Sequence, residues 1–324
     1  MARVAVVGVG AIGGVIASLL HLAGRHQIIL CTRRPLGQLI VRTPDGEIEV
    51  AATNLTDDVL ASPVDWVLVA TKTYDTEGAA RWVEPLASAG APVAVIQNGV
   101  EHRDRFASIV PQDRTLPVII DCPVERHPDG LVVQRGSVKM NVESGALGSE
   151  FAKLFIPPDG WVERTSKFIT GSLGGQVEIG FQNYTVTIDQ TDDFLTAAWR
   201  KLCFNSAGAL SALTLQPAGI LRDPEFARAA ADIVDECATV ARALGAHLDP
   251  AIAQQVIDGY RAQPFDSVNS MLADRLASRP MEIDARNGVI VRKGESLGIP
   301  TPLNRLIVAL LRAATPPTPP NASA

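Results

Sequence analysis

A glycine-rich segment near the start of the chain has the composition needed to hold phosphate groups. Gly8, Gly10 and Gly13 stand in a G-x-G-x-x-G pattern. The first glycine permits a tight turn, the second lets a pyrophosphate approach the backbone, and the third lets a helix pack on a strand. Ala11 and Ile12 lie at the expected helix start, which favours phosphate charge, so we count them among the ligand contacts. A glycine-rich turn without a ligand is the alternative.

Two arginines indicate which dinucleotide would bind. An Asp or Glu at the end of the second strand of such a fold accepts hydrogen bonds from the ribose hydroxyls of NAD. This chain has Cys31-Thr32-Arg33-Arg34 at that place and no acid. Arginine suits the additional 2′-phosphate of NADP, which a carboxylate would repel. The pattern predicts NADPH with Arg33 as the phosphate contact, and two solvated surface arginines are the alternative.

A lysine and an asparagine in the second half are the other candidates for chemistry. Lys201 and Asn205 are four residues apart in an apolar-periodic stretch, so one helix face would carry both. Leu202 and Phe204 would point toward the core. From the spacing alone, a lysine and an asparagine are more often a solvated surface pair than a catalytic one.

The histidines and cysteines indicate neither a metal site nor a histidine-based mechanism. The four cysteines are scattered without paired metal-ligand spacing, so we expect buried thiols in a reducing cytosol and no metal. Lactate-type dehydrogenases use a His–Asp pair, and the sequence shows no such arrangement. We expect surface or capping positions for the five histidines, which are His21, His26, His102, His127 and His247.

The elements that must position the glycines alternate in the first half of the chain. Apolar runs at 3–7 and 27–31 flank a helical pattern at about 11–24, which makes a β–α–β unit. Alternating strands and helices predict an α/β fold with a Rossmann-type doubly wound parallel sheet. Further strands, separated by helical stretches, are expected at 66–70, 93–96 and 116–120.

The second half is expected to be all-helical. After Asp192 alanine and leucine become more frequent, and helix-start signals recur, as at Asp223-Pro224. No assignment is made for 151–185. The sequence thus predicts three parts, which are an NADP-binding Rossmann domain at 1–191, a helical substrate and catalytic domain at 192–314, and a disordered proline-rich tail at 315–324.

A series of short motifs in a fixed order resembles the ketopantoate reductase (2-dehydropantoate 2-reductase) family. The resemblance covers nearly the full chain apart from roughly 144–185 and the tail. It implies NADPH-dependent reduction of a small 2-oxo acid. Ketopantoate is the first candidate for this substrate, which would place the protein in pantothenate and coenzyme A biosynthesis. After the glycines, the motifs are Thr71-Lys72-Thr73-Tyr74-Asp75, Gln97-Asn98-Gly99, Trp199-Arg200-Lys201-Leu202 with Asn205, Ser270-Met271-Leu272 with Asp274, Glu282-Ile283-Asp284 with Asn287-Gly288, and Gly298-Ile299-Pro300-Thr301-Pro302 with Asn304.

The resemblance implies two catalytic residues. Lys201 corresponds to the family's lysine that donates a proton to the carbonyl oxygen as hydride arrives at the carbon. A positioned acid of this kind contributes about 10²–10⁴ in rate. Glu282 corresponds to a carboxylate that engages the substrate hydroxyl and balances the lysine charge. The residues alone leave open that Glu282 is a helix-start charge.

The resemblance also implies residues that bind the ligands. Asn98 corresponds to an asparagine that orients the lysine and the substrate near the nicotinamide, and Lys72 to a lysine near the cofactor. A plain turn at Asn98-Gly99 is the alternative. The residues implied to hold the substrate are Asn205 and Ser270, together with Asn98 and Glu282.

Two positions depart from the family pattern. Ala209 stands where a second asparagine commonly follows Asn205, and Ser267 where another commonly precedes Ser270. Both amides would line the substrate pocket. A pocket with fewer polar groups would prefer a less hydroxylated 2-oxo acid, so the sequence leaves the exact substrate open.

Composition limits the partners. The chain has 324 residues and a formal net charge of -6, without the basic stripe of a nucleic-acid binder. No run of about 18 apolar residues and no signal peptide are visible, so we expect a cytoplasmic protein that does not bind membranes. The oligomeric state stays open, with a homodimer as one option. Alternative functions are a reductase of another 2-oxo acid or an imine and a non-catalytic NADP sensor, which would not need both Lys201 and Glu282.

Overall fold

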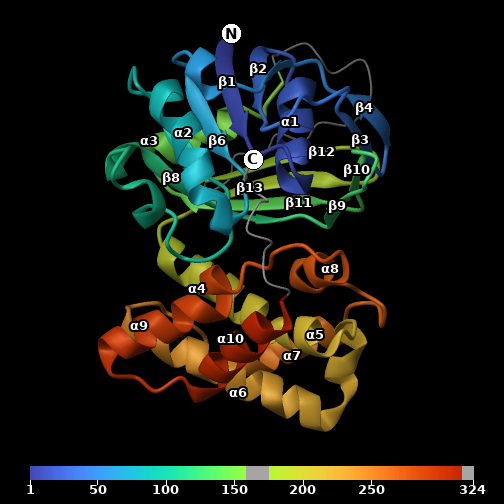
Figure 1. Ribbon diagram of the computed structural model, residues 1–324, viewed down its shortest axis with the longest axis vertical. Coiled ribbons are helices and arrows are strands. Elements are labelled where there is room, and N and C mark those ends of the chain that lie inside the picture. Colours follow the sequence, from blue (N-terminus) through green and yellow to red (C-terminus); the bar gives the residue numbers. More distant parts are fainter. Residues whose placement is uncertain (158–174, 316–324) are drawn as a thin grey trace. The chain divides into compact units, whose positions relative to one another are not determined.

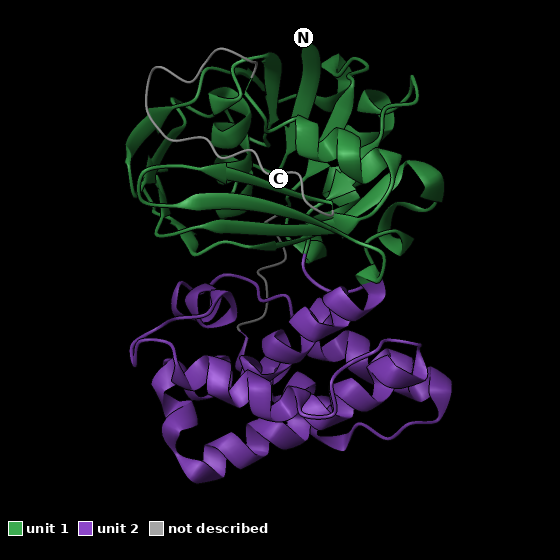
Figure 2. Cartoon of the chain, turned by 180° about the vertical axis from the view of Figure 1, so that it is seen from behind, with its two compact units in different colours: residues 1–97, 101–194 green, residues 98–100, 195–324 purple. Residues whose placement is uncertain are grey.

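The chain divides into two compact units. The structure, a computed structural model, describes residues 1–157 and 175–315. Unit 1 comprises residues 1–97 and 101–194, and unit 2 comprises residues 98–100 and 195–324 (Figure 2). The sequence places the division after residue 191 and assigns 98–100 to the first domain. Apart from Thr315, the tail expected at 315–324 lies outside the described residues.

Unit 1 is built on a nine-stranded sheet with the order β12-β13-β11-β8-β7-β6-β1-β2-β5 (Figure 1). The pairs from β5 through β8 are all parallel. Beyond β8 the sheet is mixed, because β11 pairs antiparallel with β8 and β12 pairs antiparallel with β13. The strands are β1 (Ala2–Val7), β2 (His26–Cys31), β5 (Thr53–Leu55), β6 (Trp66–Val69), β7 (Val93–Val95), β8 (Thr115–Asp121), β11 (Val138–Glu143), β12 (Gln176–Gly180) and β13 (Thr185–Thr191).

The parallel half of the sheet explains the apolar runs in the sequence. Every residue of β6 and β7 is buried, as expected for strands that are covered on both faces. The predicted α/β fold with a Rossmann-type sheet is therefore confirmed. The helices of this unit are α1 (Ala11–Leu22), α2 (Thr76–Leu86) and α3 (Ala146–Lys153), with 3₁₀ turns η1 (Asp58–Leu60), η2 (Thr73–Asp75), η3 (Asp104–Phe106) and η4 (Gln112–Arg114).

The expected helix between the strands at 93–96 and 116–120 is wrong. Only the 3₁₀ turns η3 and η4 occupy this connection. Phe106 is fully buried in η3 and anchors the connection, whereas Pro111 immediately precedes η4 and lacks the amide hydrogen that a continuous helix would need.

A second, four-stranded sheet has the order β4-β3-β10-β9. Helix α1 packs against strands of both sheets. The approach to β10 is close, because a Cβ atom added at Gly14 would lie 2.8 Å from the side chain of Val132. The strands are β3 (Ile40–Thr43), β4 (Gly46–Glu49), β9 (Val124–Arg126) and β10 (Val132–Gln134).

The described residues of unit 2 form helices and connecting loops and contain no strand, which agrees with the predicted helical second half. Local signals set the helix starts, since the Asp223 carboxylate accepts hydrogen bonds from the amides of Glu225 and Phe226 at the start of α6. No helix of the described chain is long and apolar enough to cross a membrane. The elements are α4 (Phe194–Ala207), α5 (Ala209–Thr214), η6 (Ala218–Arg222), α6 (Pro224–Ala243), α7 (Ile252–Arg261), α8 (Ser270–Leu276), the π-helical segment η7 (Asp284–Gly288), α9 (Val289–Leu297) and α10 (Pro302–Ala314).

Candidate active site

The glycine-rich loop connects β1 to α1 and fits a dinucleotide phosphate. Gly8 has φ +91°, and a Cβ atom there would lie 2.7 Å from the backbone nitrogen of Thr71. A Cβ atom at Gly13 would lie 2.0 Å from the carbonyl oxygen of Gly8. At Gly10 a Cβ atom would meet nothing within 4 Å, and no side chain caps the start of α1. This geometry leaves room for an anion at the first amides of α1.

Arg126 of β9 brings a cation to this loop. Its Nη1 donates a hydrogen bond to the carbonyl oxygen of Val9, between the first two glycines. The remaining guanidinium donors suit a phosphate oxygen. Sequence reasoning missed Arg126, because no strand was expected at 124–126.

Arg33 lies beyond the end of β2 with 82% of its side chain exposed. Its Nη1 is 3.7 Å from Oδ1 of Asp75, which belongs to η2. An exposed pair at this distance contributes about 0–1 kcal/mol, so Arg33 keeps its capacity to bind a phosphate. Lys72, which directly precedes η2, is half-buried. The assignment of Arg33 and Lys72 to the cofactor remains a proposal.

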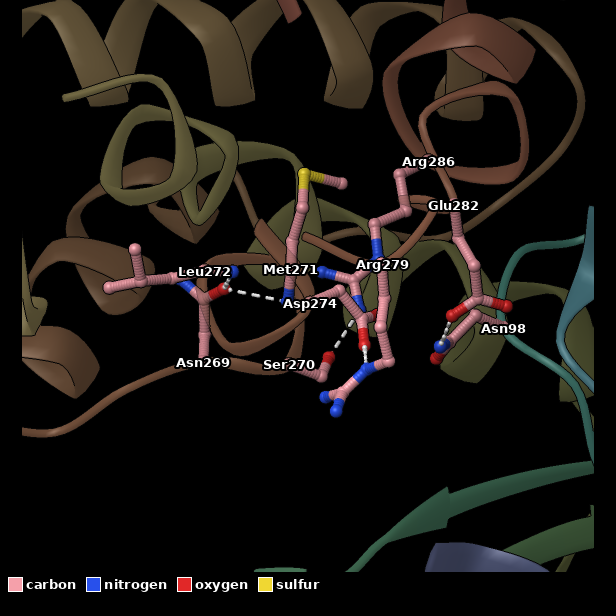
Figure 3. Close-up of polar contacts among 9 residues, drawn as sticks. All are labelled: Asn98, Asn269, Ser270, Met271, Leu272, Asp274, Arg279, Glu282 and Arg286. Carbon is pink, nitrogen blue, oxygen red and sulfur yellow. Dashed lines mark hydrogen bonds and ion pairs between the residues drawn. The ribbon is translucent and has the colours of Figure 1, made fainter. Parts of the chain in front are cut away.

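Two predicted site residues meet directly, although they are far apart in the sequence. Nδ2 of Asn98 donates a 2.7 Å hydrogen bond to Oε2 of Glu282 (Figure 3). Glu282 is buried, with 4% exposure. Asn98 belongs to unit 2 although it follows β7, because Val100 packs against the helical core. A buried carboxylate and an amide therefore form one polar pair in unit 2.

The residues beside Asn98 correct one expectation about the histidines. His102 is 3% exposed, and its Nε2 lies 2.9 Å from the carbonyl oxygen of Gln97. The Gln97 amide in turn donates to Oγ1 of Thr71 at 2.9 Å. The expected surface or capping position is thus wrong for His102, which holds the backbone just before Asn98.

Lys201 and Asn205 lie on α4, and both are half-buried. The end of this helix is tied to η7, since Nδ2 of Asn287 donates to the carbonyl oxygen of Ser206 at 3.2 Å. The same Nδ2 donates to Oδ1 of Asn304 at 2.9 Å. This fully buried link fixes the helix that carries Lys201 relative to the segment that follows Glu282.

Ser270 begins α8, and the structure pairs it with Arg286 rather than with Asn98 or Glu282. Nη2 of Arg286 donates to Oγ of Ser270 at 2.7 Å (Figure 3). Asn269 positions this serine, because its Oδ1 accepts the amides at the start of α8 and its Nδ2 donates to the carbonyl oxygen of Gly208 at 3.0 Å. Sequence reasoning missed both Asn269 and Arg286.

Of the two departures from the family pattern, Ala209 begins α5, just after the break from α4, and Ser267 lies in the loop that precedes α8. Ala209 is fully buried and Ser267 is half-buried. The break is tightly packed, since a Cβ atom at Gly208 would lie 2.6 Å from Oη of Tyr260. Burial raises the pKa of Tyr260 to about 12, so its hydroxyl stays protonated and donates to the carbonyl oxygen of Phe204 at 2.9 Å.

The fold and the phosphate loop are those of a dinucleotide-binding protein of the Rossmann class. Two family models match the chain, ketopantoate reductase PanE/ApbA over residues 4–146 and its C-terminal part over residues 193–315. A 2-dehydropantoate 2-reductase of Caulobacter vibrioides is 41% identical over 97% of this chain and 99% of its own length. The chain belongs to the ketopantoate reductase family, and the resemblance seen in the sequence is confirmed.

Solved structures agree with this membership. A PanE/ApbA family ketopantoate reductase from Ralstonia eutropha JMP134 is 29% identical, with a TM-score of 0.80 over 97% of this chain and 98% of that one. A dimeric ketopantoate reductase from Staphylococcus aureus shares the fold at 20% identity, with a TM-score of 0.77 over 97% and 98% of the two chains.

Proposed function

We propose that this chain reduces ketopantoate to pantoate with NADPH and thus serves pantothenate biosynthesis. Family membership supports the reaction. The observation in the structure that carries the proposal is the buried hydrogen bond between Asn98 and Glu282, because it joins a carboxylate and an amide that the reaction needs. The open start of α1 supports the dinucleotide.

When bound, NADPH supplies the hydride that adds to the keto carbon of the substrate. Lys201 donates a proton from Nζ to the carbonyl oxygen, so the 2-oxo acid becomes a 2-hydroxy acid and the lysine is left neutral. Its ammonium also stabilises the negative charge that develops on that oxygen. Glu282 binds the substrate hydroxyl, and Asn98 fixes the Glu282 carboxylate through the bond described above.

The cofactor contacts we propose lie in unit 1, except for Asn98 beside the nicotinamide. Backbone amides of the loop bind the pyrophosphate, Arg33 binds the 2′-phosphate and Lys72 lies near the cofactor. Asn205 and Ser270 hold the substrate. The loop residues are Gly8, Gly10, Ala11, Ile12 and Gly13.

Assembly and location are further parts of the proposal. A homodimer is supported by the dimeric relative from Staphylococcus aureus. We place the enzyme in the cytoplasm because Cys31, Cys203 and Cys237 are buried free thiols, as is typical of a reducing compartment.

NADPH oxidation over a panel of 2-oxo acids tests the proposed function. We expect ketopantoate to give the highest kcat/KM. A higher value for a 2-oxo acid without the 4-hydroxyl would instead favour a related reductase, the function that Ala209 and Ser267 support. No oxidation with any member of the panel would contradict both.

A further inference from the structure

Arg286 is a buried cation beside the proposed substrate residues. It lies in η7, four residues after Glu282, and is only 3% exposed. The neighbouring side chains Ala285 and Val289 are apolar and buried. Arginine stays protonated even in such surroundings, so its positive charge is permanent.

The charge of Arg286 has no counter-ion within the described chain. Its one side-chain hydrogen bond among residues 1–157 and 175–315 goes from Nη2 to the neutral hydroxyl of Ser270, at 2.7 Å. Its Nε is buried and has no partner in that part of the chain. A buried charge costs free energy unless it is paired. The arrangement therefore favours an anion that arrives from outside the chain.

The other two arginines of this region are already satisfied. Nε of Arg279 donates to Oδ1 of Asp274 at 3.0 Å, so a carboxylate neutralises its charge. Arg275 donates from Nη1 to the backbone carbonyl oxygens of Ala212 and Leu213. Arg279 therefore differs from Arg286 because a carboxylate neutralises its charge, and Arg275 differs because its guanidinium is bound to two backbone carbonyls. Both arginines serve as controls.

We propose that Arg286 and Ser270 together bind the carboxylate of the 2-oxo acid. Ser270 is exposed, and the buried Arg286 donates to its hydroxyl (Figure 3). Because the Ser270 oxygen accepts the arginine hydrogen, its own proton is free to donate to a carboxylate, which only accepts. Arg286 is thus a specificity-determining residue that recognises the acid group. This inference rests on the proposed function.

The position of Arg286 gives the substrate a direction. Glu282 and Arg286 extend from one short segment, with opposite charges four residues apart. The hydroxyl end of the substrate would bind at Glu282 and the carboxylate end at Arg286. A charged contact of this kind also offsets the hydrogen bonds to the substrate that are lost because Ala209 and Ser267 replace two asparagines.

The test compares a 2-oxo acid with its primary amide, which has the same shape but no negative charge. Arg286→Met should lower kcat/KM for ketopantoate about 10- to 100-fold, as expected for a lost hydrogen bond to a charged group. The value for ketopantoate amide should change little. NADPH affinity, measured by fluorescence, should stay at the wild-type value. Arg275→Met and Arg279→Met should leave the acid-to-amide ratio unchanged.

An equal loss for acid and amide in Arg286→Met would overturn the inference and make Arg286 structural. A selective loss of acid activity in Arg279→Met, with Arg286→Met unaffected, would overturn it in favour of Arg279. If Arg286→Met does not fold, Arg286→Lys takes its place, because it keeps the charge and loses the planar fork. Arg286→Lys should show a smaller loss of kcat/KM that is still selective for the acid. An equal loss for acid and amide in this variant would also overturn the inference.

Equilibrium binding separates this inference from the proposed function. Pantoate should bind to the NADP-loaded wild-type enzyme more tightly than its amide, and Arg286→Met should remove that difference. Inactive wild-type enzyme that nevertheless shows the acid preference would contradict the reaction but not the carboxylate site. Active wild-type enzyme without any preference for the acid would contradict the site but not the reaction.

Discussion

Asn98 donates a 2.7 Å hydrogen bond to Glu282 across 184 positions of sequence. The bond leaves the glutamate able to accept a second donor, since a carboxylate has about four acceptor positions. A substrate hydroxyl could therefore bind without displacing Asn98. The pair thus holds the Glu282 carboxylate in one orientation, and the carboxylate keeps its capacity to accept further hydrogen bonds.

The role of Glu282 can be tested by removing its charge while keeping its shape. Glu282→Gln retains an oxygen that can accept from Asn98, so the fold should persist. We expect kcat/KM for ketopantoate to fall about 10- to 100-fold, because the hydroxyl loses a charged acceptor. A 2-oxo acid that lacks the 4-hydroxyl should lose much less. Steady-state kinetics with both substrates gives the ratio, and an unchanged ratio would assign Glu282 a purely structural role.

Lys201 is the proposed proton donor, and its removal should slow the chemical step. Lys201→Ala should lower kcat by about 10²–10⁴. NADPH affinity should stay nearly unchanged, because Lys201 lies in the helical unit and the phosphate loop lies in the other. Kinetics combined with fluorescence titration of NADPH separates the two effects. A variant with near-wild-type kcat would show that the lysine is not the acid.

Arg33 should distinguish the two nicotinamide cofactors. Arg33→Ala should raise the Kd of NADPH about tenfold, as for one charge-assisted hydrogen bond, and leave the Kd of NADH almost unchanged. The neighbouring Arg34→Ala is the matched control and should have a smaller effect. Both constants can be measured by titration of cofactor fluorescence. Equal or tighter binding of NADH to the wild-type protein would contradict the cofactor assignment.

The parts of the molecule that sequence reasoning predicted well are set by local patterns. The spacing of Gly8, Gly10 and Gly13 after an apolar run fixes a strand, a turn and a helix within a short stretch. Asp223 caps α6 through amides two and three residues away, so the start of that helix is also visible in the sequence. By contrast, the pairing of β11 with β8 and β13 depends on contacts between distant segments.

The candidate site was predictable only in part, because much of it depends on tertiary contacts. No spacing rule connects Asn98 with Glu282, and only the family resemblance brought them together. His102 was expected at a surface or capping position, yet packing buries it, with Nε2 beside the carbonyl oxygen of Gln97. Arg286 carried one usable signal, since it is a charged residue between Ala285 and the apolar pair Val289 and Ile290. The sequence alone does not show that the Arg286 side chain would be buried, because this depends on how the segment packs in the fold.

Substrate choice should respond to the two positions where the family usually has asparagine. An unpaired substrate hydroxyl costs about 1–3 kcal/mol, so restoring an amide should raise kcat/KM for ketopantoate relative to a 2-oxo acid without the hydroxyl. Ser267 is half-buried and has room to change, whereas Ala209 is fully buried and a larger residue must displace its neighbours. Ser267→Asn is therefore the first variant to test, and the double variant with Ala209→Asn follows.

The readout for these variants is the ratio of kcat/KM between the two substrates, because overpacking at Ala209 would lower both values together. Thermal unfolding of each variant shows how much stability the added volume costs. Ala209→Ser is a smaller control that adds a hydroxyl without the bulk of an amide. We expect the ratio to rise in Ser267→Asn and further in the double variant. If wild type already prefers ketopantoate strongly and neither variant alters the ratio, the absent amides are neutral and recognition depends on Glu282 and Arg286.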